Sequence, residues 1–199
     1  MPKIVDKKQM QKKILNAAMK TFIKEGFHNS TMAKIAKEAG IAKGTLYLYF
    51  DSKEALSIAF VDSYFAKMET WLNQQGEAKT LDEFIFHIKT SLLLDAEEAK
   101  FIPVFFEAFG PSFGSEAFRK TIADYFDNMG NFYSQNIAQL IVNKEIHSDI
   151  NPQALGRVLV SMIDGIMLHY GLFSQTRENY ENMLNESLYL FKQGLLKRD

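Results

Sequence analysis

The helical periodicity of this 199-residue chain constrains its fold more than any other feature. Apolar residues recur three and four positions apart, and no convincing run alternates apolar with polar residues as a half-buried strand would. The chain has only four prolines, which leave long uninterrupted segments between Pro2, Pro103, Pro111 and Pro152. With 47% hydrophobic and 24% charged residues, an ordinary globular composition, the sequence predicts an all-α fold.

The predicted helices cover about residues 6–25, 31–39, 43–49, 51–75, 81–99, 101–109, 114–143, 151–173 and 177–196. Thr31 is a candidate N-cap, and Asn151 is expected to cap a helix that has Pro152 at its first position. Asp51 and Glu54 have the spacing of a capping box, which predicts the start of a long helix. Gly110 and Pro111 are expected to end the helix before them.

Charge is distributed unevenly along the chain. Residues 1–56 contain eleven lysines and five acidic residues, a balance of +6, whereas residues 57–199 contain twelve basic and nineteen acidic residues, a balance of −7. Such an asymmetry indicates that the N-terminal end meets a polyanion, although a solvated lysine-rich helix would have the same composition.

The stretch AGIAKGTLYLYF, residues 39–50, follows the second predicted helix. Gly40 permits a sharp turn, and Ile41 and Leu46 are expected to pack inward and fix the angle between the helices. Three short helices joined by tight turns are typical of a helix-turn-helix, whose second helix enters the major groove of DNA. Lys43 and Thr45 would then lie at the start of the recognition helix.

The segment TMAKIAKEAGIAKGTLYLYFDSKEAL, residues 31–56, resembles the DNA-binding motif of the TetR family of bacterial transcriptional regulators. Ala42 departs from the family pattern, which often has serine there. The resemblance implies a helix-turn-helix DNA-binding domain over residues 1–54, with its motif at 31–50, and a helical regulatory and dimerisation domain over residues 55–199. It also implies DNA contacts by Thr31, Lys43, Gly44, Thr45, Tyr47, Tyr49 and Lys53.

The resemblance further implies a homodimer formed through the last two long helices. Apolar stripes on these helices are consistent with that expectation, although they would also suit the core of a single chain. The residues predicted at the dimer interface are Leu155, Leu159, Ile166, Leu184, Leu188, Phe191 and Leu195.

The middle of the chain is rich in phenylalanine and methionine, which suits a cavity for an apolar or aromatic effector as well as an ordinary core. The residues predicted to contact an effector are Phe60, Tyr64, Phe86, Phe105, Phe109, Phe126, Met162 and His169. Glu107 and Asp164 are carboxylates in apolar segments, which could pair with a cationic ligand, with a helix N–H or with an arginine. Because no His and carboxylate spacing resembles a ligand set, we predict no metal and no cofactor.

The chain contains no cysteine, which excludes disulfides and cysteine nucleophiles. We find no glycine-rich phosphate loop and no catalytic serine or zinc motif, so we do not expect an enzyme. Without a signal-peptide pattern or a membrane-spanning apolar run, we expect a cytoplasmic protein. The sequence predicts a repressor that binds a palindromic operator and is released by a small ligand. An activator or an architectural DNA-binding protein is the alternative.

Overall fold

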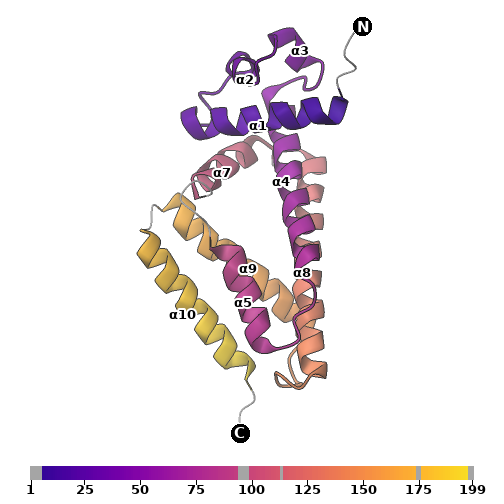
Figure 1. The fold of residues 1–199 in the computed structure, drawn as a ribbon, viewed down its shortest axis with the longest axis vertical. Coiled ribbons are helices and arrows are strands. Elements are labelled where there is room, and N and C mark those ends of the chain that lie inside the picture. Colours follow the sequence, from indigo (N-terminus) through magenta and orange to yellow (C-terminus); the bar gives the residue numbers. More distant parts are fainter. Residues whose placement is uncertain (1–5, 94–98, 113, 174–175, 197–199) are drawn as a thin grey trace. The chain divides into compact units, whose positions relative to one another are not determined.

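The computed structural model describes residues 6–93, 99–112, 114–173 and 176–196, without the side chains of residues 108, 109, 111, 112 and 117. Every element in these ranges is a helix, which confirms the predicted all-α fold (Figure 1). The helices are α1 (Lys7–Glu25), α2 (Met32–Glu38), α3 (Lys43–Tyr47), α4 (Lys53–Gln75), α5 (Leu81–Leu92), α7 (Phe101–Ser112), α8 (Glu116–Val142), α9 (Pro152–Leu172) and α10 (Arg177–Leu195).

The chain forms two compact units. The first contains Met1–Phe65 and Pro103–Thr121, and the second contains Ala66–Ile102 and Ile122–Asp199. The chain passes from one unit to the other within α4, α7 and α8. Each unit has its own apolar core.

The core of the first unit is formed mainly by α1, α2 and α3. Buried apolar side chains at spacings of three and four residues line the inner face of α1, including Ile14, Ala18 and Phe22. Leu46 of α3 is fully buried in the same core. Because α1 and α2 pack together and α2 contacts α3, the three helices form one small body around these side chains.

The core of the second unit joins α5, α8, α9 and α10. α10 packs against both α5 and α9. Its Tyr180 stacks on Tyr170 of α9 and donates a hydrogen bond to the carbonyl oxygen of Leu92. α8 and α9 approach closely at Gly156, where an added Cβ would lie 2.5 Å from the carbonyl oxygen of Gly130. This contact requires glycine, because no side-chain movement could relieve a clash with backbone.

The structure has the predicted helix caps at two positions and a different cap at a third. Thr31 and Asn151 accept hydrogen bonds from the third residue of α2 and α9, as predicted. The Asp51 capping box predicted for α4 is wrong, since Ser52 Oγ accepts from the backbone N–H of Ala55 at 3.1 Å. α4 begins at Lys53, so Ser52 rather than Asp51 stands directly before its first turn.

Two other predicted helix ends differ from the structure. α7 continues through Gly110 and Pro111 to Ser112, because a proline in the last turn removes only one helical hydrogen bond. α5 ends at Leu92, seven residues before the predicted end, and residues 94–98 of the prediction lie outside the described ranges.

Candidate nucleic-acid interface

Residues within the turn between α2 and α3 determine its conformation. Gly40 has a φ of +63°, a left-handed conformation that glycine adopts without strain. The backbone N–H of Ile41 then donates to the carbonyl oxygen of Ala36 at 3.0 Å, which closes the turn. Buried Ile35 and Leu46 hold the two helices on the same core. The structure therefore has the helix-turn-helix geometry that the sequence predicts for this segment.

The outer face of α3 carries four residues that point away from this core. Lys43, Gly44, Tyr47 and Leu48 are all exposed, whereas Leu46 on the opposite side is fully buried. The Nζ atom of Lys43 lies 5.7 Å from the ring centroid of Tyr47, so the two side chains are neighbours one helical turn apart.

The other predicted DNA contacts are less exposed or occupied by contacts inside the chain. Thr45 is half-buried on the flank of α3, and Tyr49 is half-buried and packs against the core of the first unit. Thr31 is exposed, and its hydroxyl oxygen accepts a hydrogen bond from the N–H of Lys34 at 3.3 Å. The structure places these residues on or beside one helix-turn-helix, and their contacts with DNA remain a prediction.

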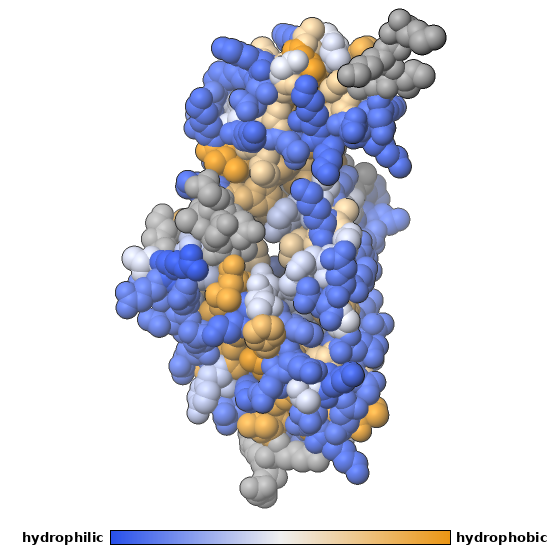
Figure 2. Space-filling view, viewed as in Figure 1, coloured by the Kyte–Doolittle hydropathy of each residue, from blue (hydrophilic) through white to orange (hydrophobic). Residues whose placement is uncertain are grey.

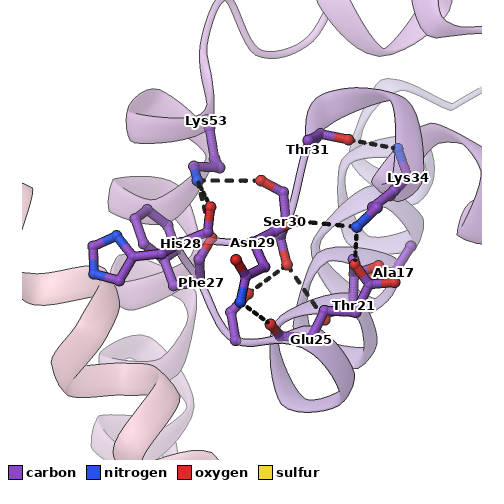
Figure 3. A network of polar contacts seen from close by, with 11 residues as sticks. Ala17, Thr21, Glu25, Phe27, His28, Asn29, Ser30, Thr31, Lys34 and Lys53 are labelled. Atoms are coloured by element: carbon purple, nitrogen blue, oxygen red, sulfur yellow. Dashed lines mark hydrogen bonds and ion pairs between the residues drawn. The ribbon is translucent and has the colours of Figure 1, made fainter.

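Lys53 has a structural role that the sequence did not reveal. Its ammonium group donates to the carbonyl oxygens of Phe27 at 2.9 Å, Ser30 at 3.2 Å and His28 at 3.4 Å (Figure 3). The same Nζ atom lies 4.4 Å from the centroid of the Phe27 ring. Lys53 therefore fixes the loop between α1 and α2, and a phosphate would compete with these carbonyls for its protons.

A carboxylate from α7 binds the same loop through a backbone N–H. Glu107 Oε2 accepts a hydrogen bond from the N–H of Phe27 at 2.7 Å, so its partner is a loop N–H and not the helix N–H or arginine that the sequence suggested. Within the loop, the buried hydroxyl of Ser30 donates to the carbonyl oxygen of Gly26 at 2.7 Å. Lys53 of α4 thus binds carbonyl oxygens of this loop, and Glu107 of α7 binds one of its N–H groups.

Hydrophilic side chains dominate the visible surface of the helices in the first unit (Figure 2). The lysines of α1 and α2 contribute to it, and most of them are exposed. A few apolar side chains also reach the surface around α3 in this view. A basic surface beside an exposed helix face is suited to the phosphate backbone and the base edges of a duplex.

The residues predicted to contact an effector are divided between the two units. Phe60, Tyr64 and Phe105 belong to the first unit, where the Tyr64 and Phe105 ring centroids lie 5.2 Å apart. Phe126 and Met162 pack against the core of the second unit. Phe86 is 62% exposed, and His169 is also exposed. The side chain of Phe109 lies outside the described part of the chain.

The second unit has a pocket of about 310 Å³ between α4 and α8. Buried Leu72 and Met129 contribute apolar surface, and Glu69 Oε1 accepts a hydrogen bond from Asn128 at 2.5 Å. None of the seven predicted effector residues whose side chains the structure describes lines it. The lining consists of Glu69, Leu72, Asn73, Tyr125, Asn128, Met129, Asn131, Phe132 and Gln135.

A half-buried carboxyl lies elsewhere in the second unit. Burial raises the pKa of Asp164, on α9, to about 7. Its negative charge helps to raise the pKa of Tyr133, after the larger effect of burial on that phenol. Among the described residues, no three histidine or carboxylate side chains are grouped so that they could hold a metal ion.

Most residues predicted at the dimer interface are buried in the single chain, and a dimer interface at these residues stays a prediction. An exposed fraction of at most 5% is found at Leu159, Ile166, Leu184, Leu188 and Leu195. Leu155 and Phe191 are half-buried. The periodicity identified the apolar face of each helix correctly, but that face packs inward.

Other side chains of α9 and α10 remain at the surface. Val158 is 58% exposed on α9, and Tyr189 and Leu190 are 56% and 61% exposed on α10. Among the described helices, α9 alone is long and apolar enough to cross a membrane by length and composition, a test that core helices of other proteins also pass. Only 28% of its most apolar window is buried in the single chain.

Residues 14–60 match the family model described as bacterial regulatory proteins, tetR family. A fatty acid metabolism regulator protein of Bacillus subtilis is 37% identical over 70 residues, and this alignment spans 33% of the chain and 36% of that relative. The uncharacterised HTH-type transcriptional regulator YvdT of the same organism is 23% identical over 187 residues, which span 92% and 93% of the two chains.

Solved structures share the whole fold. A TetR transcription regulator from Haloarcula marismortui has a TM-score of 0.82 at 19% identity, over 96% of this chain and all of that chain. The Bacillus subtilis regulator FadR in complex with stearoyl-CoA has a TM-score of 0.74 at 22% identity, over 92% and 98%. With the helix-turn-helix geometry described above, these similarities show that residues 14–60 match the tetR family model and that the whole chain has the fold of TetR regulators.

Proposed function

We propose that the protein regulates transcription by binding an operator through α3. The observation that carries this proposal is the outer face of α3, where Lys43 and Tyr47 stand exposed on a helix-turn-helix with a basic surface. A lysine ammonium group can donate to guanine acceptors or to phosphate, and a phenol can bond phosphate oxygens. Regulation rather than catalysis also fits the relatives, which are named as regulators. Binding to the chromosome would take place in the bacterial cytoplasm.

The proposed active form is a homodimer on an inverted repeat. The exposed apolar surface of α9 and α10, with Val158, Tyr189 and Leu190, supports this form because a second copy would remove it from water. A two-fold dimer presents two copies of α3 to half-sites about 34–36 Å apart, one turn of the duplex, or to a multiple of that distance.

The proposed regulatory step is release of the operator when a small effector binds the second unit, which makes the protein a repressor. The complex of the structural neighbour FadR with stearoyl-CoA supports a ligand-binding role for this helical fold. For the effector to act, it must bind the state that does not fit the operator more tightly than the state that does. The operator and the effector therefore have to be identified in separate experiments.

Selection of bound duplexes from a random pool, with purified protein at moderate salt, tests the proposed function. We expect an enriched inverted repeat whose half-sites are one duplex turn apart or a multiple of one turn. Salt-sensitive binding without any enriched sequence would contradict an operator-specific regulator and would favour the architectural alternative.

A further inference from the structure

Leu48 stands at the end of α3 with 81% of its surface exposed, the largest exposed fraction of any large apolar side chain that the structure describes. It is the C-cap residue of the helix, and Gly44 lies one turn before it on the same outer face. A Cβ atom added to Gly44 would meet no heavy atom within 4 Å. The outer face of α3 therefore presents a leucine side chain beside bare backbone.

Leu48 and Gly44 lie beside side chains that are suited to contact a DNA duplex. Lys43 precedes Gly44 directly, and the Tyr47 side chain, 41% exposed, precedes Leu48. The lysine excess of residues 1–56, with a balance of +6 from eleven lysines and five acidic residues, favours a polyanion as the partner of this surface. In the major groove the apolar group on a base edge is the C5-methyl of thymine.

We propose that Leu48, with the open backbone at Gly44, binds the methyl group of one thymine in each operator half-site and is thereby a specificity-determining residue. The inference rests on the proposed DNA-binding function. Leu48 is not among the DNA contacts that the family resemblance implies. The contact needs the leucine side chain for attraction and the missing side chain at Gly44 for close approach.

Uracil substitution in the selected operator tests the contact, because uracil differs from thymine only by the missing methyl group. Each thymine is replaced in turn, symmetrically in both half-sites, and affinity is measured for the wild type and for Leu48→Ala. We expect one position at which uracil lowers the affinity of the wild type about fourfold per half-site, the effect of exposing one methyl group. Leu48→Ala should bind the thymine and uracil duplexes equally at that position.

Two further variants separate the contact from a change in folding. Leu48→Met keeps a flexible apolar side chain and should keep most of the uracil effect. Val142→Ala truncates another exposed aliphatic side chain, 71% exposed at the end of α8, and should leave the uracil profile unchanged. Because Leu48 faces solvent, Leu48→Ala should melt at the temperature of the wild type.

The inference is overturned if no thymine is sensitive to uracil, or if the sensitivity is the same in Leu48→Ala. Failure to select any operator would instead overturn the proposed function, and the inference with it. The two failures are distinguishable because specific binding is established before the uracil duplexes are measured.

Discussion

The loop before α2 in the first unit and the contact between α8 and α9 in the second unit are held by different interactions. In the first unit, Lys53 and Glu107 bind carbonyl oxygens and an N–H of the loop before α2. In the second unit, α8 and α9 meet almost backbone to backbone at Gly156, beside apolar packing and the ion pair between Arg157 and Asp127. Directional hydrogen bonds fix the position of a short loop, whereas close packing fixes only shape and volume.

This difference has a functional consequence. A helix that reads base edges must be held in one orientation, and the hydrogen bonds at residues 26–31 orient the segment that leads into α2 and α3. A regulatory unit must instead allow two packings if an effector is to shift the equilibrium between them. Substitutions at the α8–α9 contact and at the loop before α2 should therefore differ in the size of their effects.

The largest effect is expected from Gly156→Ala. The new methyl group would lie 2.5 Å from the carbonyl oxygen of Gly130 and 2.9 Å from the backbone nitrogen of Ser134, so the helices must separate. We expect the free energy of unfolding, measured with urea, to fall by about 3 kcal/mol or more.

Gly165→Ala on the same helix is the matched control. An added Cβ there meets nothing within 4 Å, so the variant should be unchanged or more stable by up to about 1 kcal/mol. Equal stability of the Gly156 and Gly165 variants would show that α8 and α9 do not approach as closely as described.

Asp164→Asn should make the second unit more stable at high pH. Burial raises the pKa of this carboxyl from 3.8 to about 7, so between these values the folded protein holds a proton that the unfolded chain has released. The free energy of unfolding of the wild type should therefore fall as the pH rises from 4 to 7 and level off above it.

The expected difference between pH 5 and pH 8 is about 2 kcal/mol in the wild type, and the asparagine variant should lack this contribution. Urea unfolding of both proteins at the two pH values measures it. A wild type and a variant with parallel pH profiles would contradict the burial of Asp164.

Lys53→Ala should lower the free energy of unfolding by about 1 to 2 kcal/mol, because its ammonium group donates to three carbonyl oxygens. Lys37→Ala removes the same charge from an exposed position on α2 and should change stability by less than about 0.5 kcal/mol. If the two variants unfold alike, the contacts of Lys53 with the loop contribute nothing.

The salt dependence of DNA binding measures the other role predicted for Lys53. Loss of a phosphate contact reduces the slope of log affinity against log salt by about 1 and weakens all sequences alike. A reduced slope together with lower stability would mean that Lys53 exchanges its loop carbonyls for phosphate when DNA binds. An unchanged slope would limit its role to the loop.

The smallest effect is expected at Glu107. Glu107→Ala removes the acceptor for the N–H of Phe27 and should cost about 1 kcal/mol, whereas Glu107→Gln keeps an oxygen acceptor and should cost less. Hydrogen exchange at the Phe27 amide measures the bond directly. We expect faster exchange in the alanine variant than in the glutamine variant, and equal rates would contradict the bond.

The same contrast explains what could be predicted from sequence. Gly40 and Thr31 occur where the backbone needs a left-handed turn and an N-cap, so local rules located the helix-turn-helix correctly. Leu184 and Leu188 lie on the apolar face of α10 as predicted, but periodicity does not say whether that face meets another helix of the same chain or a second copy. Tertiary contacts, which no local pattern encodes, bury these two leucines within the single chain.

The hydrogen bonds to residues 26–30 were hidden from sequence for a related reason. Lys53 is 25 positions from His28, and Glu107 is 80 positions from Phe27. From sequence alone, a lysine near a helix-turn-helix is assigned to DNA contact, because its hydrogen-bond partners elsewhere in the chain are unknown. Leu48 was missed because an aliphatic residue is ordinarily assigned to the core, and only its 81% exposure shows that it faces outward.

The measurement that tests the central claim most directly is the affinity for the selected duplex relative to a scrambled duplex, at one salt concentration. It compares the wild type with a Lys43→Ala, Thr45→Ala double variant. If α3 reads base edges, the wild type should prefer the selected duplex by at least about 10³-fold, and the double variant should lose about tenfold or more of that preference. A preference that is unchanged in the double variant would contradict the assignment of base recognition to α3.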